Sequence, residues 1–173
     1  MIVSMQWPLS LTTERLLLRP VEPPDIPTHT RLWTDPEVRR HLGGPVPGEV
    51  VRVRGERIVG LPGLLSVVRA EDGVVIGSVL VEPGARDGRT EISYQLLPEH
   101  WGSGYAREAM AAVVLWMPSG VPGADAVAVT QEANLRSRRL LESLGATPVE
   151  RFVEWGKPQV LYVLTGGQGF NNS

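Results

Sequence analysis

The part of this chain that could do chemistry is a pair of glycines around a serine, Gly102-Ser103-Gly104, between an apolar run and an amphipathic run. Glycine lets the backbone turn tightly, and its N–H groups can approach a ligand because no Cβ atom stands in the way. A helix that begins here directs its unpaired N–H groups and the positive end of its dipole into the loop. These features favour a phosphate site.

Spacing distinguishes three kinds of phosphate loop. A nucleoside-triphosphate P-loop has Lys and Ser or Thr after its last glycine, whereas Tyr105 and Ala106 follow Gly104 here. A dinucleotide fingerprint needs three glycines and an acidic residue at the end of a second strand. This loop has two of the glycines, and Asp125 begins a strand instead of ending one. The remaining candidate is the pyrophosphate loop of acyl-coenzyme A transferases.

The elements that must position the loop follow from the sequence pattern. Apolar and β-branched runs bounded by turn residues predict strands over residues 11–19, 64–69, 74–82, 91–97, 124–130, 149–155 and 159–165. Helices are expected as two short pieces over 28–42, then over 48–58, 106–117 and 134–144. Asp35-Pro36 is read as an N-cap and first helical residue, and Gly145 as a left-handed C-cap.

Several connections are also predicted. The prolines at 23, 24 and 27 favour an extended or turn-rich link, and residues 71–73 a hairpin turn. The tail 166–173 should be disordered. Antiparallel strands come first and strand–helix–strand units follow. We therefore expect the α/β class, with one mixed sheet flanked by helices and with strands 91–97 and 124–130 as parallel neighbours.

From the loop outward, the chain resembles the GNAT superfamily of N-acetyltransferases, whose loop has the form Gln/Arg-x-x-Gly-x-Gly/Ala. Trp101 to Ala106, WGSGYA, continued by Arg107, Glu108 and Ala109, is similar to the branch that acetylates ribosomal-protein N-termini. Trp101 stands where most members have Gln or Arg. Residues 134–145 resemble the second helix of the family and residues 13–19 its opening strand, so that the resemblance covers about residues 11–165.

The resemblance implies that acetyl-CoA is the co-substrate and lies in a V-shaped cleft where the two parallel middle strands splay apart. The backbone at Leu96 and Leu97 would meet the oxyanion and the pantetheine amides, and Asn134 and Ser137 would face the pantetheine arm. The loop N–H groups would hold the pyrophosphate, with side-chain support from Ser103 or Arg107. The implied cofactor-binding residues are Leu96, Leu97, Trp101, Gly102, Ser103, Gly104, Tyr105, Ala106, Arg107, Asn134 and Ser137.

Aminolysis of a thioester needs a neutral amine, donors for the oxyanion and a route for the proton. Glu91 is the candidate catalytic base, because strand alternation places it on the same face as Ser93 and Gln95. An ordinary solvated carboxylate is an equal interpretation. Glu99 and His100 are further candidates at the cleft mouth. Many members protonate the leaving thiolate with a tyrosine of the second helix, but this chain has Leu141 there.

Other side chains have alternative interpretations. Asn134 could be only a helix N-cap. Arg136, Arg138 and Arg139 form a basic helix face, either solvated or near the adenosine 3′-phosphate. The three histidines lack the spacing of a metal site, so no metal is expected.

Composition limits the class of protein. With 173 residues, 42% of them apolar, the chain is most simply one domain over 1–173. A net charge of −2 gives no reason to expect nucleic acid as a partner, and the absence of cysteine excludes disulfides and a cysteine nucleophile. Without a signal-peptide start or a long apolar run, we expect no membrane partner and a cytoplasmic monomer or homodimer.

Two functions are compatible with these patterns. The first is transfer of an acetyl group from acetyl-CoA, by direct attack, to a primary amine acceptor on a small molecule or a protein N-terminus. Residues 33–42 and 151–159 would contact that acceptor. The alternative is a coenzyme A-binding regulatory module of the same fold without turnover, suggested by Leu141 and by the short segment between Gly43 and Gly63.

Overall fold

The computed structural model describes residues 7, 10–117 and 126–164. Within these residues, eight strands form one mixed sheet in the order β1-β2-β3-β4-β5-β6-β8-β7. The strands are β1 (Leu11–Thr12), β2 (Leu16–Pro20), β3 (Leu64–Arg69), β4 (Val75–Arg86), β5 (Arg89–Leu96), β6 (Ala126–Gln131), β7 (Thr147–Glu154) and β8 (Lys157–Leu164). The helices are α1 (Ile26–Thr34), α2 (Gly48–Gly55), α3 (Tyr105–Trp116) and α4 (Leu135–Ser143). The predicted mixed α/β fold is therefore confirmed.

Strands β5 and β6 are parallel but pair only at their beginnings. The ladder contains Thr90 opposite Ala126 and Glu91 opposite Val127, after which the two strands separate. β5 nevertheless continues to Leu96, bonded to β4, and β6 continues to Gln131, bonded to β8. Each strand keeps a full partner on its outer side, so the sheet can open between them. This is the predicted splay, and it leaves a V-shaped gap on the C-terminal side of both strands.

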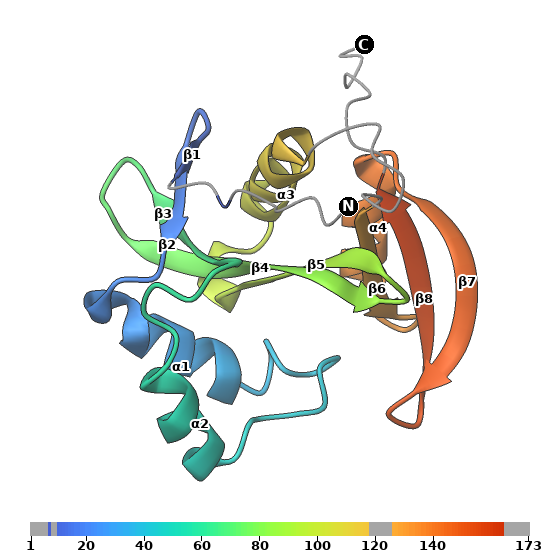
Figure 1. Ribbon diagram of the computed structural model, residues 1–173, viewed down its shortest axis with the longest axis horizontal. Coiled ribbons are helices and arrows are strands. Elements are labelled where there is room, and N and C mark those ends of the chain that lie inside the picture. The colour runs from blue at the N-terminus through green and yellow to red at the C-terminus, as the bar shows by residue number, and fades with distance from the viewer. Residues whose placement is uncertain (1–6, 8–9, 118–125, 165–173) are drawn as a thin grey trace.

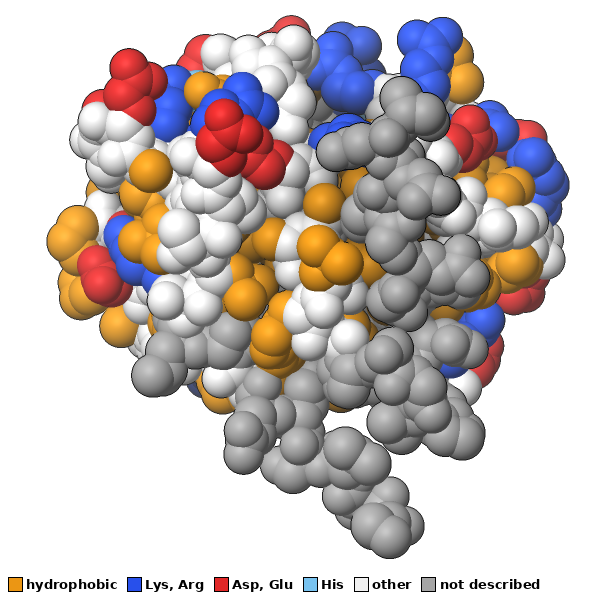
Figure 2. Space-filling model, turned by 90° about the horizontal axis from the view of Figure 1, so that it is seen from above, with side chains coloured by type: hydrophobic (Ala, Val, Ile, Leu, Met, Phe, Trp, Pro, Cys, Tyr) orange, Lys and Arg blue, Asp and Glu red, His pale blue; other side chains and the backbone are white. Residues whose placement is uncertain are grey.

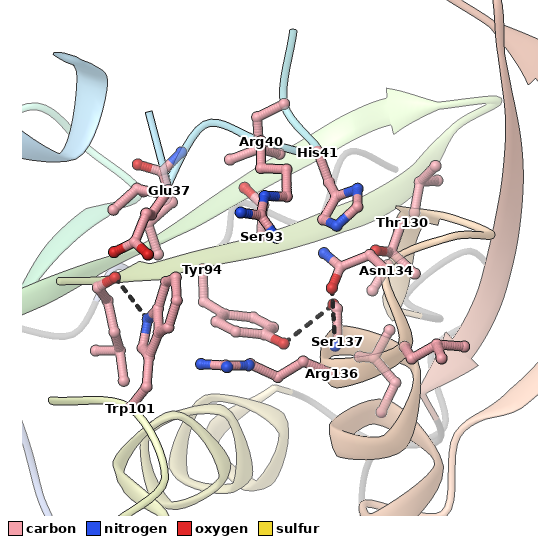
Figure 3. Close-up of a pocket in the computed structure, with 18 of the residues that line it drawn as sticks. Glu37, Arg40, His41, Ser93, Tyr94, Trp101, Thr130, Asn134, Arg136 and Ser137 are labelled. Atoms are coloured by element: carbon pink, nitrogen blue, oxygen red, sulfur yellow. Dashed lines mark hydrogen bonds between the residues drawn. The ribbon is translucent and has the colours of Figure 1, made fainter. Parts of the chain in front are cut away.

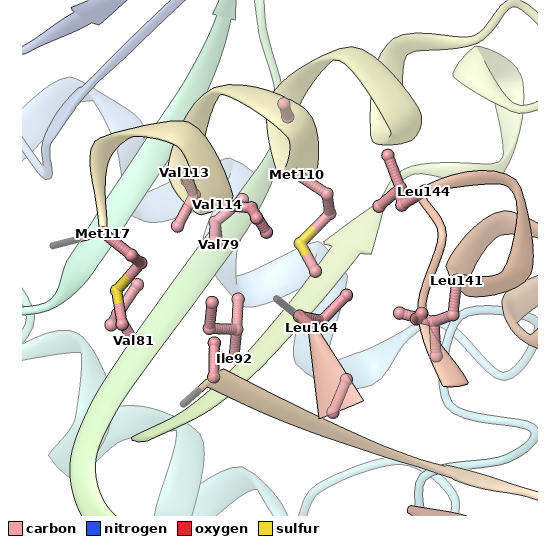
Figure 4. Packing of buried hydrophobic residues seen from close by; sticks show 14 of the residues in the cluster. Val79, Val81, Ile92, Met110, Val113, Val114, Met117, Leu141, Leu144 and Leu164 are labelled. Atoms are coloured by element: carbon pink, nitrogen blue, oxygen red, sulfur yellow. The ribbon is translucent and has the colours of Figure 1, made fainter. Parts of the chain in front are cut away.

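Helices cover both faces of the sheet (Figure 1). α1 and α2 lie on one face, and α3 and α4 lie on the other. The buried stripe of α3 packs on the central strands and against α4, as Figure 4 shows; it consists of Ala109, Met110, Val113 and Val114. A run with apolar residues three and four positions apart places all of them on one helix face, which explains why this segment folds here.

The outer face of α3 is less buried. Leu115 is 56% exposed there. In Figure 2, which looks onto this side of the molecule, apolar side chains gather toward the middle and charged ones lie mostly at the edges. No helix among the described residues is long and apolar enough to cross a membrane.

A buried polar network joins α1 to the sheet. The Ser66 hydroxyl donates to Oδ2 of Asp25 at 2.8 Å and therefore accepts from Nε2 of His29 at 3.0 Å. Arg19 donates to both oxygens of Asp25, at 2.6 and 3.1 Å. Asp25, His29 and Ser66 are each at most 2% exposed. Because a buried polar group is costly unless it is bonded, this network fixes the orientation of α1.

The structure corrects two predictions near the N-terminus in their detail. The expected strand over 11–19 is two strands, because the chain turns at 13–15. There Thr13 N–H donates to the Leu16 carbonyl, and Glu108 of α3 binds the Thr13 hydroxyl and the Arg15 amide. Of the extended or turn-rich link expected over 23–27, the structure has the turn form, a 3₁₀ turn (Pro23–Asp25), but this turn leads directly into α1, which begins two residues earlier than predicted. Proline is compatible with a first helical turn, where no N–H partner is needed.

Further along, the second of the two short helices expected over 28–42 is a series of turns after Asp35. Asp35 Oδ1 accepts from the N–H groups of Glu37 and Val38, as an N-cap would, but no regular helix follows. β4 is longer than predicted and ends at a turn with positive φ at Asp87 and Gly88. α2, the 71–73 turn and the Gly145 cap are confirmed. Residues 124–125 and the tail 166–173 lie outside the described residues.

Candidate active site

The glycine loop adopts the predicted strand–loop–helix geometry. β5 ends at Leu96, a 3₁₀ turn (Pro98–His100) follows, and α3 begins at Tyr105. Gly102 and Gly104 have φ values of 82° and 81°, and Gly104 is the N-cap of α3. Only glycine adopts this left-handed conformation without strain, so both glycines are required by the path of the backbone.

Arg15 supports the loop from the outside, a role the sequence did not indicate. Its guanidinium donates to the Ser103 carbonyl at 2.9 Å and to Glu108 Oε1 at 2.9 Å, and it lies 4.3 Å from the centre of the Tyr105 ring. Burial raises the pKa of Glu108, but hydrogen bonds from Thr13 and Arg15 outweigh this effect and hold it below its usual range. Glu108 is therefore a charged anchor for Arg15.

A cavity of about 280 Å³, here called the loop cavity, lies at the beginning of α3. Its walls come from the loop, from the end of β5 and from α4. Three arginines border it: Arg107, Arg136 and Arg139. Arg107 also contacts Ser143, its Nε lying 3.3 Å from the serine Oγ. A helix N-terminus beside three guanidinium groups is a suitable environment for a phosphorylated ligand.

A second cavity of about 410 Å³, here called the cleft cavity, fills the gap between the splayed strands. β5 and β6 form its floor, and the first turns of α4 form one wall. Turns 37–42 form the opposite wall and contribute Glu37, Arg40 and His41 (Figure 3). Tyr94, Leu96, Trp101 and Arg136 border both cavities, so the two spaces adjoin.

Trp101 connects the end of β5 to the loop. Its Nε1–H donates to the Leu96 carbonyl at 2.9 Å, and the Arg136 guanidinium lies 4.0 Å from its ring centre. Leu97 N–H donates to the Ile76 carbonyl within the sheet. Since alternate residues of a strand bond to opposite sides, the backbone groups of Leu96 point toward the cleft and the Leu97 N–H points away from it. Of the two predicted backbone contacts, only Leu96 is directed into the cleft.

Asn134 and Ser137 both border the cleft cavity, as the sequence predicted. Asn134 Oδ1 accepts from the Ser137 N–H at 3.2 Å, so Asn134 is also the N-cap of α4. The Ser137 hydroxyl accepts a hydrogen bond from the Tyr94 hydroxyl at 3.0 Å. The predicted contact of Asn134 and Ser137 with the pantetheine arm stays a prediction, and Tyr94 was not identified from the sequence.

This geometry can be compared with known proteins. A family model described as "Acetyltransferase (GNAT) domain" matches residues 15–147. The chain belongs to the GNAT acetyltransferase family. Related proteins include an N-acetyltransferase p20 of Bacillus licheniformis, 29% identical over 145 residues, which cover 78% of this chain and 80% of that protein. Another is an FsC-acetyl coenzyme A-N(2)-transacetylase of Aspergillus fumigatus, 27% identical over 83% of this chain and 67% of that protein.

Solved structures show the same fold. A GNAT-family acetyltransferase from Bacillus anthracis superposes with a TM-score of 0.78 at 20% identity, covering 91% of this chain and 98% of that one. A ribosomal-protein-S5-alanine acetyltransferase from Vibrio fischeri gives a TM-score of 0.70 at 16% identity, covering 92% and 97%. These likenesses show the fold, whereas the family model and the curated relatives identify this GNAT chain as an N-acetyltransferase. Its resemblance to the ribosomal-protein branch is loose.

Glu91, the candidate base of this acetyltransferase, lies at the closed end of the V. Its carboxylate accepts from Arg86 at 3.1 and 3.3 Å and is 17% exposed, and Arg86 also binds Glu154 at 2.8 Å. Ser93 and Gln95, on the same strand face, border the cleft cavity, whereas Glu91 does not. The alternation was predicted correctly. The role of Glu91 as the base stays a prediction.

The other proposed bases of the acetyltransferase lie at the loop. Glu99 is paired with Arg31 at 2.7 and 3.2 Å, and this contact lowers the pKa of its carboxyl. His100 borders the loop cavity, 3.5 Å from Arg69. A carboxylate whose pKa is lowered is a poorer proton acceptor, so Glu99 is the less suitable of the two. The described residues contain no group of three His, Asp or Glu that could hold a metal ion.

The sequence analysis expected residues 33–42 on the acceptor side, and the structure places three polar residues of this segment, Glu37, Arg40 and His41, at the cleft cavity. His41 Nδ1 lies 3.3 Å from Gln131 Oε1 at the end of β6, so these turns reach over the splayed strands. The resemblance placed this segment near the acceptor, whereas the Asp35-Pro36 pair predicted a helix where the structure has turns.

Proposed function

We propose that this acetyltransferase binds acetyl-CoA along the splay and transfers the acetyl group to a primary amine by direct attack. The proposal rests mainly on the short β5–β6 ladder. Because the two strands separate, the cleft cavity opens between them, directly beside the loop cavity at the N-terminus of α3. When bound, acetyl-CoA supplies an activated thioester. Residues of the chain must supply the donors for the oxyanion and the route for the proton of the amine.

The residues present fit that ligand. The N–H groups from Gly102 to Arg107 can face a pyrophosphate, because both glycines leave the backbone uncovered. Arg136 and Arg139 add positive charge at the edge of the loop cavity. The Leu96 N–H points to the cleft and can donate to a carbonyl oxygen that gains negative charge during attack. Asn134 and Ser137 supply polar contacts along the α4 wall.

The acceptor amine would enter from the side of turns 37–42. Ser93 and Gln95 of β5 and His41 of the turns border this part of the cleft. The amine must lose a proton to attack. We propose that Glu91 receives it through water, since Glu91 lies on the same face as Ser93, two residues nearer the closed end of the V.

Binding can be tested before the acceptor is known. Isothermal titration with acetyl-CoA, dephospho-coenzyme A and ATP should show tight binding of acetyl-CoA, weaker binding of the dephospho form and little binding of ATP. Free-thiol release with a panel of amines and N-terminal peptides then tests turnover. No binding of acetyl-CoA would refute the proposal. Binding without thiol release across a wide panel would indicate a coenzyme-binding module without turnover.

A further inference from the structure

Turns 37–42, the wall of the cleft cavity opposite α4, are held by hydrogen bonds on both sides of their middle. The Arg39 guanidinium donates to the Gly44 carbonyl at 2.9 Å, and the Gly44 N–H donates to the Arg39 carbonyl at 3.1 Å. Toward β6, His41 Nδ1 lies 3.3 Å from Gln131 Oε1. Because these contacts fix the backbone before and after it, the residue between Arg39 and His41 is presented to the cleft from a defined position.

That residue is Arg40, and its charge is not used by the fold. Arg40 borders the cleft cavity, and in Figure 3 its side chain extends from the turns toward the floor of the cleft, where Ser93 lies. Other arginines of this part of the chain have protein partners, such as Arg31 with Glu99. Among the residues that the structure describes, no ion pair or hydrogen bond involves the Arg40 guanidinium. It is therefore available to a ligand in the cleft.

Glu37 gives the same wall an opposite charge. It borders the cleft cavity at the Trp101 end, and Arg40 follows in the direction of His41 (Figure 3). In the described part of the chain, no ion pair joins Glu37 to Arg40, although they lie three positions apart. Trp101 binds the carbonyl of Leu96, the residue proposed to meet the thioester carbonyl. The acceptor amine must therefore reach the Glu37 end of this wall.

This charge pattern distinguishes among the acceptors that could supply the amine. A polyamine or an aminoglycoside would bring a further cation beside Arg40, and like charges brought together oppose binding. A protein N-terminus carries an amide beside its amine and no carboxylate. A free amino acid carries an ammonium group and a carboxylate one carbon apart. The planar guanidinium of arginine matches a carboxylate with two parallel hydrogen bonds.

We propose that the acceptor is a free amino acid, with its carboxylate on Arg40 and its amine on the Glu37 side. A bond forms between the amine nitrogen and the acetyl carbonyl carbon, and the bond from that carbon to sulfur breaks with its electron pair on sulfur. The amine proton leaves through water toward Glu91, as proposed above. The products are an N-acetyl amino acid and coenzyme A. Arg40 is thus a specificity-determining residue, and this role rests on the proposed function.

Matched acceptors test the inference. Free amino acids are each compared with the corresponding carboxamide and with the amine that lacks the carboxyl group, in free-thiol release from acetyl-CoA at pH 7.5. The amine of a carboxamide is the weaker base, so a larger fraction of it is neutral at this pH. Reactivity in solution therefore favours the amide, and a preference for the acid must come from the site. We expect kcat/KM to be at least about tenfold higher for the acid, because hydrogen bonds to charged groups are strong.

Variants identify the residue. Arg40→Gln should lower kcat/KM for the acids about ten- to a hundredfold, with little change for the amides or in acetyl-CoA affinity. Arg40→Lys keeps the charge without the planar fork and should retain part of the preference. Arg40→Glu should shift the preference to diamines, in which a second ammonium group replaces the carboxylate. Thermal unfolding of each variant confirms folding.

Arg52→Gln is the matched control. Arg52 is an exposed arginine of α2 that pairs with Glu49 and Glu56 and borders neither cavity. Its replacement removes the same charge from the same part of the chain and should leave the ratio of kcat/KM between acids and amides unchanged.

The results separate the two proposals. If acetyl-CoA does not bind, or if no amine releases thiol, the proposed function fails and the inference fails with it. If amides, simple amines or N-terminal peptides react as well as the acids, the amino-acid inference is wrong while the proposed function stands. An equal loss for acids and amides in Arg40→Gln, or a changed preference in Arg52→Gln, also overturns the role of Arg40.

Discussion

Replacing Gly104 by valine tests whether the glycine loop is a coenzyme site. Gly104 has φ of 81°, and a Cβ atom added there would lie 3.4 Å from Nη2 of Arg15. A left-handed backbone costs an L-residue about 1–2 kcal/mol, and a β-branched side chain is especially poorly accommodated. The valine variant must either keep this strain or relax by turning its N–H groups out of the loop cavity.

The two responses have different magnitudes. Strain of about 1–2 kcal/mol lowers the melting temperature of a chain of this size by about 2–8 °C, which leaves the protein folded at 25 °C. A relaxed loop loses hydrogen bonds to the pyrophosphate, each worth about 1.5–3 kcal/mol for a charged acceptor. Loss of two such bonds weakens coenzyme binding by at least about a hundredfold.

The assay is titration calorimetry with acetyl-CoA, together with thermal unfolding. Gly88→Val is the matched control. Gly88 has φ of 80°, with open space around its Cβ position, and lies before β5, whereas the loop follows β5. Eight strand residues place these sites about 25 Å apart. The control should lose similar stability and keep its affinity. Unchanged affinity in Gly104→Val would refute the assignment of the loop.

Three further predictions concern charge. Glu91→Gln should lower kcat at least tenfold and leave coenzyme affinity unchanged; a normal pH profile would remove Glu91 as the base. Arg139→Ala should weaken coenzyme binding about two- to fivefold at low salt, with a difference that vanishes in 1 M salt because an exposed charge is screened; a salt-independent difference would contradict this. Burial lowers the pKa of His29, so the unfolded chain binds its proton first and the folded state loses stability as pH falls below about 6.5. Chemical denaturation at pH 7 and pH 5 should show that His29→Gln loses less stability between these pH values than the wild type does. An equal loss of stability in the two proteins would refute this role of His29.

Local patterns predicted the centre of this fold correctly. The path from β5 through Gly102 and Gly104 into α3 depends on residues close together in sequence, so turn chemistry and helical periodicity are sufficient. The splay itself followed from the resemblance to the family. The start of α1 was missed because the prolines at 23, 24 and 27 were read as an extended or turn-rich link, although proline fits a first helical turn.

Long-range contacts could not be predicted in the same way. The bond from Tyr94 to Ser137 joins residues 43 positions apart, and the support of the loop by Arg15 joins residues 88 apart. No periodicity encodes either contact, because each depends on how the sheet brings distant segments together. The turns after Asp35 show the same difficulty, since one capping residue does not determine whether a helix continues.

The two-pair ladder between β5 and β6 also has a consequence for how the molecule unfolds. β1 to β5 form one continuous antiparallel sheet, and β6, β8 and β7 form another. Backbone bonds across the junction are few, so the two parts are held together mainly by side chains, among them Met110, Leu141 and Leu144 of the shared core. Amide hydrogen exchange should therefore resolve two cooperative units instead of one. Their boundary lies along the cleft, so a ligand that contacts both walls should slow the opening of both units together.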